Sequence, residues 1–435
     1  MRIHARQALL PEGWAPDVAI DIAPDGTIVA VAPGTRRAPD DDAVDGALLP
    51  GMPNVHSHAF QRAMAGSAER RGPGDDDFWS WREAMYALAA SLQPDDLKAL
   101  ATSVYRKMLR AGYTAVAEFH YLHRDPSGRW YADKAVMARA LVEAAREAGL
   151  AVCLLPALYA HADVGGAPLA DRQKRFATTV DDVLAIADEL RAAYANDPSV
   201  VVGACAHSLR AVTPAELRAL VEGSPPDVPV HLHVAEQLRE VRSVEATLGA
   251  RPVAWLLANH DVDRRWCLVH ATQVDDSERD ALARSGAVVG LCPTTEANLG
   301  DGVFPLAPYL RANGAFSIGS DSNVSIAPAE ELRWLEYGQR LATGRRIVAA
   351  RRAGESCGQT LYASAASAGA RACGFATGAI APGCRADFVV IAPEEAEGDL
   401  PRTADDTPET MLDRYVFASS DARPERVYVR GRVIR

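Results

Sequence analysis

Short apolar, β-prone runs alternate with longer helix-forming segments from about residue 47 to residue 375, and this alternation constrains the fold more than any other feature. Pro94–Ala111 is one such helical segment, with Gly112 just after its end, and Asp133–Ala148 is another. Strands that alternate with helices predict a parallel sheet, and eight strands are the number that closes a barrel. We therefore predict an α/β fold with a (β/α)8 TIM-type barrel. The eight runs are Ala47–Leu49, Tyr113–Ala117, Ala151–Leu155, Val200–Ala204, Val228–His233, Trp266–His270, Ala287–Leu291 and Ala315–Gly319.

Strand signals of another kind occupy both ends of the chain. Val18–Ile22 and Thr27–Val31 flank a Pro-Asp-Gly turn, which is typical of a β-hairpin. Ala386–Ile391 and Arg426–Val429 bracket an acidic loop, Glu394–Glu409. We expect the two ends to pair into one small β-sandwich domain. The predicted boundaries are 1–50 together with 376–435 for the small domain, and 51–375 for the barrel.

Composition excludes several classes of partner. The net charge is -11 and no basic cluster is present, which argues against nucleic acid. No apolar run is long enough to span a bilayer, and no basic stretch followed by an apolar segment marks a signal peptide. The seven cysteines stand singly, without a C-x-x-C pair, as buried thiols do in a reducing compartment. We expect a cytoplasmic protein that binds neither nucleic acid nor membranes.

Two histidines stand at the end of the first predicted barrel strand, in Val55-His56-Ser57-His58. Residues i and i+2 of a strand point to the same side, so both imidazoles can face the barrel axis. Neutral imidazoles are good zinc ligands. An H-x-H pair alone could be two histidines near a turn, so the other strand ends must decide.

Three further polar residues fall where a barrel would bring them beside this pair. His233 ends the fifth strand, His270 ends the sixth, and Asp321 follows the eighth. His231 shares the parity of His233 and stays an alternative ligand, although the residue nearer the carboxyl end of the strand is favoured. Such groups at four strand ends, on the face where barrel enzymes work, predict a metal-dependent active site.

Glu236 lies three residues after His233, where the chain leaves the fifth strand. A carboxylate there can approach a water without being a metal ligand, which suits proton transfer. The lysines bear on the number of metal ions, because many two-metal hydrolases use a carboxylated lysine as a bridge. None lies on a predicted strand, so one metal ion is favoured. The four lysines are Lys98, Lys107, Lys134 and Lys174.

These residues, in this order, resemble the amidohydrolase superfamily, and most closely its mononuclear deaminase branch. The resemblance implies one Zn²⁺ per chain. The implied zinc ligands are His56, His58, His233 and Asp321. The implied catalytic residues are Glu236, His270 and Asp321, the last acting as a proton acceptor as well as a ligand.

Four longer strings resemble one family of that branch, the formimidoylglutamate deiminases of histidine degradation. They are Pro50–Arg62, Glu118–His123, Ala206–Arg210 and Cys292–Gly302. The strings extend beyond the implied ligands into loops that would touch a substrate. The resemblance implies hydrolysis of N-formimino-L-glutamate to N-formyl-L-glutamate and ammonia, by a homodimer.

A substrate with two carboxylates needs cations at some distance from the metal, and arginine suits bidentate carboxylate binding. Arg210, three residues after His207 and just past the fourth strand, is one candidate, and His207 is expected to line the site with it. The resemblance suggests Arg82, in the long first loop, from its own or a neighbouring subunit. Gln61 and Tyr121 are the polar residues expected to meet the formimino group or the α-carboxylate.

Two other functions are compatible with the same ligands. A deaminase of the same branch could act on a purine, pyrimidine or triazine ring, but a flat substrate favours stacking side chains near the metal, and the loops here offer arginine and histidine. A catalytically silent metal-binding barrel is the other alternative, although every expected ligand and proton carrier is present. Formimino-aspartate also stays open as a substrate, since it is only one methylene shorter. The remaining histidines, His120, His123, His161 and His260, are expected to be structural.

Overall fold

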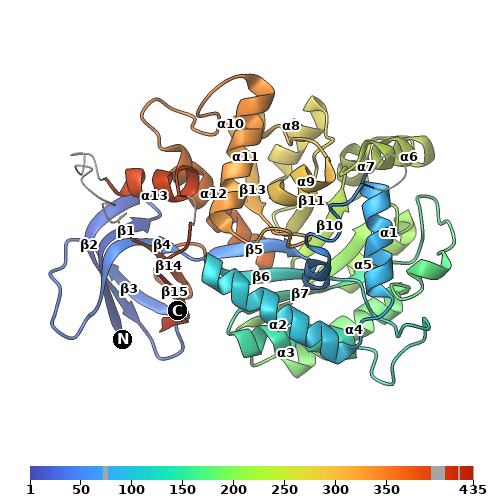
Figure 1. Cartoon of the computed structure of the whole chain (residues 1–435), viewed down its shortest axis with the longest axis horizontal. Helices are drawn as coiled ribbons and strands as arrows, with labels where there is room; N and C mark the ends of the chain where they lie inside the picture. Colours follow the sequence, from blue (N-terminus) through green and yellow to red (C-terminus); the bar gives the residue numbers. More distant parts are fainter. Residues whose placement is uncertain (72–76, 393–406, 420–421, 435) are drawn as a thin grey trace.

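The computed structural model describes residues 1–71, 77–392, 407–419 and 422–434, which form a helix-covered barrel beside a small sheet (Figure 1). The barrel strands run parallel and follow one another around the sheet in chain order, with β8 paired to β7 off this path. The predicted (β/α)8 fold is confirmed. Its described strands are β5 (Met52–Ser57), β6 (Tyr113–His120), β7 (Ala151–Leu158), β8 (Val200–Val202), β9 (Ala204–Ser208), β10 (Val230–Val234), β11 (Trp266–His270), β12 (Val288–Leu291) and β13 (Ala315–Ile318).

The barrel closes where the chain after β13 meets β5. The backbone N–H of Asp321 donates to the carbonyl of His56 at 2.9 Å, and the N–H of His58 donates to the carbonyl of Asp321 at 2.9 Å. A glycine is needed at the closest approach, since a Cβ on Gly319 would lie 2.8 Å from the Cβ of His56. The seam of the barrel therefore brings the predicted ligands of the first and last strands together.

The helices surround the barrel, and α2 shows how their ends are encoded. Pro94 occupies the first turn of α2 with two aspartates, and Gly112 ends the helix in a left-handed conformation at φ +106°. The predicted helix Pro94–Ala111 is confirmed. The described helices are α1 (Phe78–Ala89), α2 (Pro94–Ala111), α3 (Val136–Ala148), α4 (Val180–Ala193), α5 (Pro214–Gly223), α6 (Leu238–Leu248), α7 (Pro252–Asn259), α8 (Asp276–Ser285), α9 (Pro293–Leu299), α10 (Leu306–Arg311), α11 (Pro328–Thr343), α12 (Cys357–Cys373) and α13 (Pro408–Phe417), with 3-10 turns η1 (Ala59–Met64) and η2 (Asp171–Gln173).

The small β-domain contains strands from both ends of the chain, and both termini lie on its side of the molecule in Figure 1. The sheet bends back on itself, because Thr27 bridges Arg385 just ahead of β14, and it encloses a core of its own. The boundaries at 50/51 and 375/376 stay a prediction. In sheet order the described strands are β16 (Arg432–Val433), β15 (Arg426–Val429), β14 (Phe388–Ile391), β4 (Asp42–Pro50), β1 (Arg2–Leu10), β2 (Gly13–Ile22) and β3 (Ile28–Ala32).

Two of the eight predicted barrel runs need correction. Ala47–Leu49 belongs to β4 of the small sheet, where it pairs with β14, and the first barrel strand begins at Met52. Val200–Ala204 spans a break at Gly203, so the fourth barrel strand proper is β9 and extends to Ser208. A side chain at Gly203 would collide with Leu155, which explains the glycine at this position. Most of the predicted acidic loop, Glu394–Glu409, lies outside the described residues.

No helix in the described ranges is long and apolar enough to cross a bilayer. The seven cysteines, all in described segments, carry free thiols, and six of them are buried.

Candidate metal centre and active site

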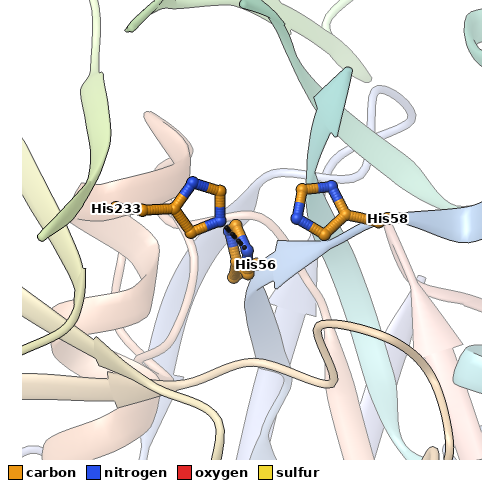
Figure 2. Close-up of side chains that lie close together, drawn as sticks. All are labelled: His56, His58 and His233. Atoms are coloured by element: carbon orange, nitrogen blue, oxygen red, sulfur yellow. Dashed lines mark hydrogen bonds between the residues drawn. The ribbon is translucent and has the colours of Figure 1, made fainter. Parts of the chain in front are cut away.

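The four predicted zinc ligands converge at the carboxyl end of the barrel. Nε2 of His56 lies 3.0 Å from Nε2 of His233, and the rings of these two residues and of His58 point toward one another (Figure 2). Oδ1 of Asp321 lies 3.3 Å from Nε2 of His56 and 3.4 Å from Nε2 of His58. His56 and His58 at the end of β5, His233 on β10 and Asp321, three residues after β13, thus place their donor atoms in two overlapping groups that share His56.

Hydrogen bonds behind the rings fix which nitrogen faces this point. Nδ1 of His58 donates to the carbonyl of Phe119 at 2.8 Å, and Nδ1 of His233 donates to the carbonyl of His207 at 2.8 Å. Each bond leaves the Nε2 lone pair free, the arrangement typical of metal-bound histidine. Burial lowers the pKa of His56 to about 3, and burial also lowers the pKa of His58 and His233. The three rings are therefore neutral.

The donor set fits a single tetrahedral cation. Two ligand atoms at about 2.0 to 2.1 Å from a tetrahedral Zn²⁺ lie about 3.3 Å apart. The separations of His56 from His233 and of Asp321 from His56 and His58, between 3.0 and 3.4 Å, are close to this value. His231 is outside the set, because its Nε2 contacts the carbonyl of Ala372 at 2.7 Å. Among the described strands none carries a lysine, so the cluster lacks a bridging carboxylated lysine.

Asp321 is held in the charged form and in an unusual backbone conformation. Burial would raise the pKa of its carboxyl, but the hydrogen bond from His56 and the positive charge of His270 hold that pKa well below its usual range. The residue adopts a φ of +44°, in the left-handed region that non-glycine residues seldom occupy. While Oδ1 faces the histidine ligands, Oδ2 lies 4.0 Å from Nε2 of His270. One oxygen can bind metal while the other accepts a proton.

His270 and Glu236 stand side by side on the next strand ends. Nε2 of His270 lies 3.7 Å from Oε1 of Glu236, and both side chains are buried. Burial raises the pKa of Glu236 to about 7. Burial lowers the pKa of His270, but the carboxylates of Glu236, Glu296 and Asp321 outweigh it and raise that pKa to about 10. A carboxyl with a pKa near neutrality suits a group that both takes and gives protons.

A cavity opens over these groups, and its lining contains the five predicted substrate-binding residues. Arg82 reaches the cavity of its own chain. The role of each residue in binding stays a prediction. These five are Gln61, Arg82, Tyr121, His207 and Arg210.

The cavity contains a buried cation, Arg210, that forms no ion pair in the described part of the chain, although the carboxylates of Glu236 and Glu240 lie close enough to interact with its charge. Arg210 is only 5% exposed, and its Nε has no hydrogen-bond partner among the described residues. Arg82 donates to the hydroxyl of Tyr159 at 2.9 Å. Both guanidinium groups lie over the ring of Trp79, at 5.7 and 5.4 Å from its centroid. A buried guanidinium with free donors is suited to a carboxylate ligand.

Gln61 in η1 and Tyr121, the residue that follows β6, form a polar pair. Nε2 of Gln61 donates to the hydroxyl of Tyr121 at 2.8 Å, whereas its Oε1 is buried without a partner in the described part of the chain. His207, expected beside Arg210, lies on β9, one residue before the strand ends. The amide oxygen of Gln61 is thus available to an N–H donor on a ligand.

Several cavity residues were not predicted from the sequence. Helix α1 contributes Phe78, Trp81 and Met85, and Leu299 comes from the end of α9. Apolar side chains therefore accompany the arginine and histidine in the site. The tryptophan content of the Ala59–Gln93 insertion was the available signal, but no periodicity showed which face of α1 turns inward.

Comparison with known proteins gives a consistent result. Residues 47–434 match the amidohydrolase family, and residues 1–45 match the N-terminal domain of formimidoylglutamate deiminase HutF. A formimidoylglutamate deiminase of Pseudomonas aeruginosa is 47% identical over 99% of this chain and 93% of its own. A 5-methylthioadenosine/S-adenosylhomocysteine deaminase of Haloarcula marismortui is 30% identical over 84% of this chain and 78% of its own.

Solved structures agree with the fold. An amidohydrolase from Brucella melitensis superposes with a TM-score of 0.93 at 44% identity, covering 99% of this chain and 94% of that one. An adenosine deaminase from Xanthomonas campestris with bound zinc has a TM-score of 0.78 at 24% identity, covering 99% of this chain and 92% of that one.

Proposed function

The chain belongs to the formimidoylglutamate deiminase family of the amidohydrolases, and from this we propose that it hydrolyses N-formimino-L-glutamate to N-formyl-L-glutamate and ammonia in histidine degradation. The relatives support the reaction class, and the site supports the substrate. The observation that carries the proposal is the buried Arg210, whose Nε has no hydrogen-bond partner among the described residues, in the same cavity as the metal-ligand candidates. A carboxylate of the substrate can accept from this guanidinium.

We propose one Zn²⁺ per chain, held by His56, His58, His233 and Asp321. The neutral imidazoles, the charged carboxylate and their separations support this assignment. When bound, such an ion supplies a nucleophile at neutral pH by lowering the pKa of water.

The residues of the chain supply the proton transfers. Oδ2 of Asp321 accepts a proton from the attacking water as its oxygen bonds to the formimino carbon. His270, within 4.0 Å of both carboxylates, stabilises charge as the tetrahedral carbon forms. Glu236 delivers its proton to the terminal nitrogen, and the proton that Asp321 took from water supplies the second. The C–N bond then breaks, ammonia leaves, and the hydroxyl proton returns to Glu236 as the formyl group forms.

Release of ammonia from a substrate panel tests the proposal. The panel contains formimino-glutamate, formimino-aspartate, guanine, cytosine and adenosine. We expect the highest kcat/KM with formimino-glutamate, because the relative that is 47% identical is a formimidoylglutamate deiminase and the cavity offers Arg210 to a substrate carboxylate. A purine or pyrimidine turned over more efficiently would contradict the proposal and favour a ring deaminase.

A cytoplasmic location and a homodimeric state stay predictions. Since Arg82 reaches the cavity of its own chain, a second chain is not needed to supply this arginine. Sedimentation equilibrium of the purified protein tests the oligomeric state, and cell fractionation tests the location.

A further inference from the structure

One of the strings that resemble the deiminase family, Cys292–Gly302, contains none of the candidate metal ligands or proton carriers. In the structure this string forms α9 at the end of β12, and Glu296 lies in the first turn of that helix. The Glu296 side chain is buried, at 5% exposure, and does not line the cavity. It contacts His270 instead, and His270 does line the cavity.

Glu296 contacts His270 on the side away from the metal ligands. Its Oε1 accepts from Nδ1 of His270 at 3.2 Å and from the backbone N–H of Cys292 at 2.8 Å. The second bond ties the carboxylate to the end of β12, so its position is set by the barrel. The imidazole ring is rigid, and its two nitrogens point in different directions in the ring plane. A hydrogen bond that holds Nδ1 in place therefore also fixes the direction of Nε2. That atom faces Glu236 at 3.7 Å and Asp321 at 4.0 Å.

The backbone at His270 explains why such a bond is needed. His270 has a φ of +69° and Ala271 a φ of +51°, so both depart from strand geometry. Left-handed conformations at non-glycine residues cost free energy and persist where other contacts hold them. A half-turn of the ring about Cβ–Cγ would exchange Nδ1 with a carbon and lose the bond to Glu296.

The same three residues, His270, Cys292 and Glu296, could instead hold a metal ion. The ligand atoms of His270, Cys292 and Glu296 lie within 4.8 Å of one another. However, Oε1 of Glu296 already accepts two hydrogens. Burial also raises the pKa of the Cys292 thiol well above its usual range, which disfavours the thiolate that a metal requires. The contacts fit a hydrogen-bonded pair better than a second metal site.

We propose that Glu296 is a positioning residue for the deimination, which holds the His270 imidazole through Nδ1 so that Nε2 faces Asp321 and Glu236. The inference deepens the proposed function and rests on it for its kinetic tests. Glu296 contacts the reacting groups only through His270. Removing it should therefore impair the chemical step and spare substrate binding.

Four variants test this role by ammonia release from formimino-glutamate: E296A, E296Q, H270N and the double variant E296A/H270N. We expect E296A to lower kcat by about 10- to 100-fold, with little change in KM, as loss of a ligand-orienting contact does. E296Q should regain most of this kcat, because its amide oxygen can accept the same two hydrogens. In the H270N background E296A should cost nothing further, since coupled residues are not additive. Equal losses in both backgrounds, or a loss in E296Q as deep as in E296A, would overturn the proposal.

A matched control is Glu331 of α11, which contacts the same helix α9 at Thr294. Glu331 is fully buried and accepts from the N–H and hydroxyl of Thr294, at 2.9 and 2.6 Å, and no bond joins it to His270. E331Q should lower the melting temperature and leave kcat of the folded enzyme unchanged. A kcat loss equal to that of E296A would show that the packing of α9, and not the bond to His270, matters.

Inactivity of the wild-type enzyme toward formimino-glutamate would contradict the proposed function but would not test the positioning role. Two readouts that do not depend on turnover test that role separately: the orientation of the His270 ring and the metal content. A crystal structure of E296A should show the His270 ring rotated, whatever the substrate, and an unmoved ring would contradict the positioning role. One metal ion per chain in both wild type and E296A is expected. A second ion lost on substitution would instead make Glu296 a ligand.

Discussion

Nε2 of His56 lies 3.0 Å from Nε2 of His233, although 177 positions separate the two residues in the chain. Nδ1 of His233 is already engaged as a donor to a backbone carbonyl, so its Nε2 presents a lone pair. Nδ1 of His56 is buried without a partner among the described residues, and two Nε2 atoms at this distance fit a cation held between them. The closure of the barrel between β5 and β13 adds the carboxylate of Asp321 to this pair.

Removal of the metal should abolish activity and lower stability together. Treatment with a chelator should reduce ammonia release to background, and one equivalent of Zn²⁺ per chain should restore it. A ligand that binds only the folded state adds about 4 kcal/mol at 1,000 times its dissociation constant, so the melting temperature should fall on removal. Elemental analysis and differential scanning calorimetry measure both effects. Full activity in metal-free protein would contradict the proposed site.

Two histidines of β10 provide a matched pair of substitutions. His233→Asn should remove metal binding and activity, because its Nε2 faces the ligand cluster. His231→Asn should retain the metal and lose only the hydrogen bond to Ala372, which is worth about 1 kcal/mol. Metal content and melting temperature distinguish the two variants. Metal loss in His231→Asn alone would make His231 the ligand.

The ligand positions could be predicted from the sequence because period-2 alternation and strand order determine them. His56 and His58 share a face by spacing alone, and parallel strands in a barrel end on one rim. The first strand was misplaced because Ala47–Leu49 and Met52–Ser57 form two adjacent apolar runs, and a side chain at the Gly51 between them would collide with Thr114. Hydrophobicity cannot show such a change from one sheet to the next.

The role of Glu296 could not be predicted, for a different reason. It follows the seventh strand in a short helix, and nothing in the spacing of Cys292–Gly302 shows that the first turn of α9 faces β11. The same holds for Trp79, whose contacts with Arg82 and Arg210 depend on how α1 lies over the barrel. Local sequence encodes these helices, whereas tertiary packing selects the side chains that enter the site.

Glu236→Gln should separate catalysis from folding. Glutamine keeps the shape of the side chain and removes the proton carrier, so kcat should fall by about two to four orders of magnitude, the range for a general acid–base. Metal content and melting temperature should barely change, because Glu236 is outside the ligand cluster. Activity assays, elemental analysis and calorimetry on one preparation check this result. An unimpaired kcat would mean that protons reach the leaving nitrogen by another route.

Gly319→Ala should weaken the barrel at its seam. The added methyl would lie 2.8 Å from Cβ and the backbone atoms of His56, so β5 or the chain after β13 must move. Overpacking of this kind costs about 1 to 3 kcal/mol, and it should also lower metal affinity by moving His56. Gly338→Ala in α11 is the control, since its Cβ would meet Val303 at an ordinary 3.6 Å. Urea unfolding should show a loss only for Gly319→Ala; equal stability of the two variants would exclude strain at the seam.

Arg210→Met tests the substrate assignment itself. If Arg210 binds a substrate carboxylate, the variant should lose about 2 to 5 kcal/mol in kcat/KM for formimino-glutamate, as a buried charge pair does when one partner is removed. Methionine keeps much of the length and apolar contact of the side chain. A small formamidine without carboxylates should be a poor substrate of both forms and should be almost unaffected by the substitution.

Arg239→Met is the matched control for that experiment, because Arg239 lies 4.2 Å over the same Trp79 ring, is exposed and does not line the cavity. Arg239→Met removes a cation close to the cavity without removing a direct contact. Its effect on kcat/KM therefore measures the long-range attraction between the protein and the doubly charged substrate, and salt screens this attraction. A loss in Arg210→Met that persists in high salt and exceeds that of Arg239→Met identifies a direct carboxylate contact. Equal losses of Arg210→Met on formimino-glutamate and on the small formamidine would instead mean that Arg210 braces the loop after β9. The choice of substrate would then rest on the relatives alone.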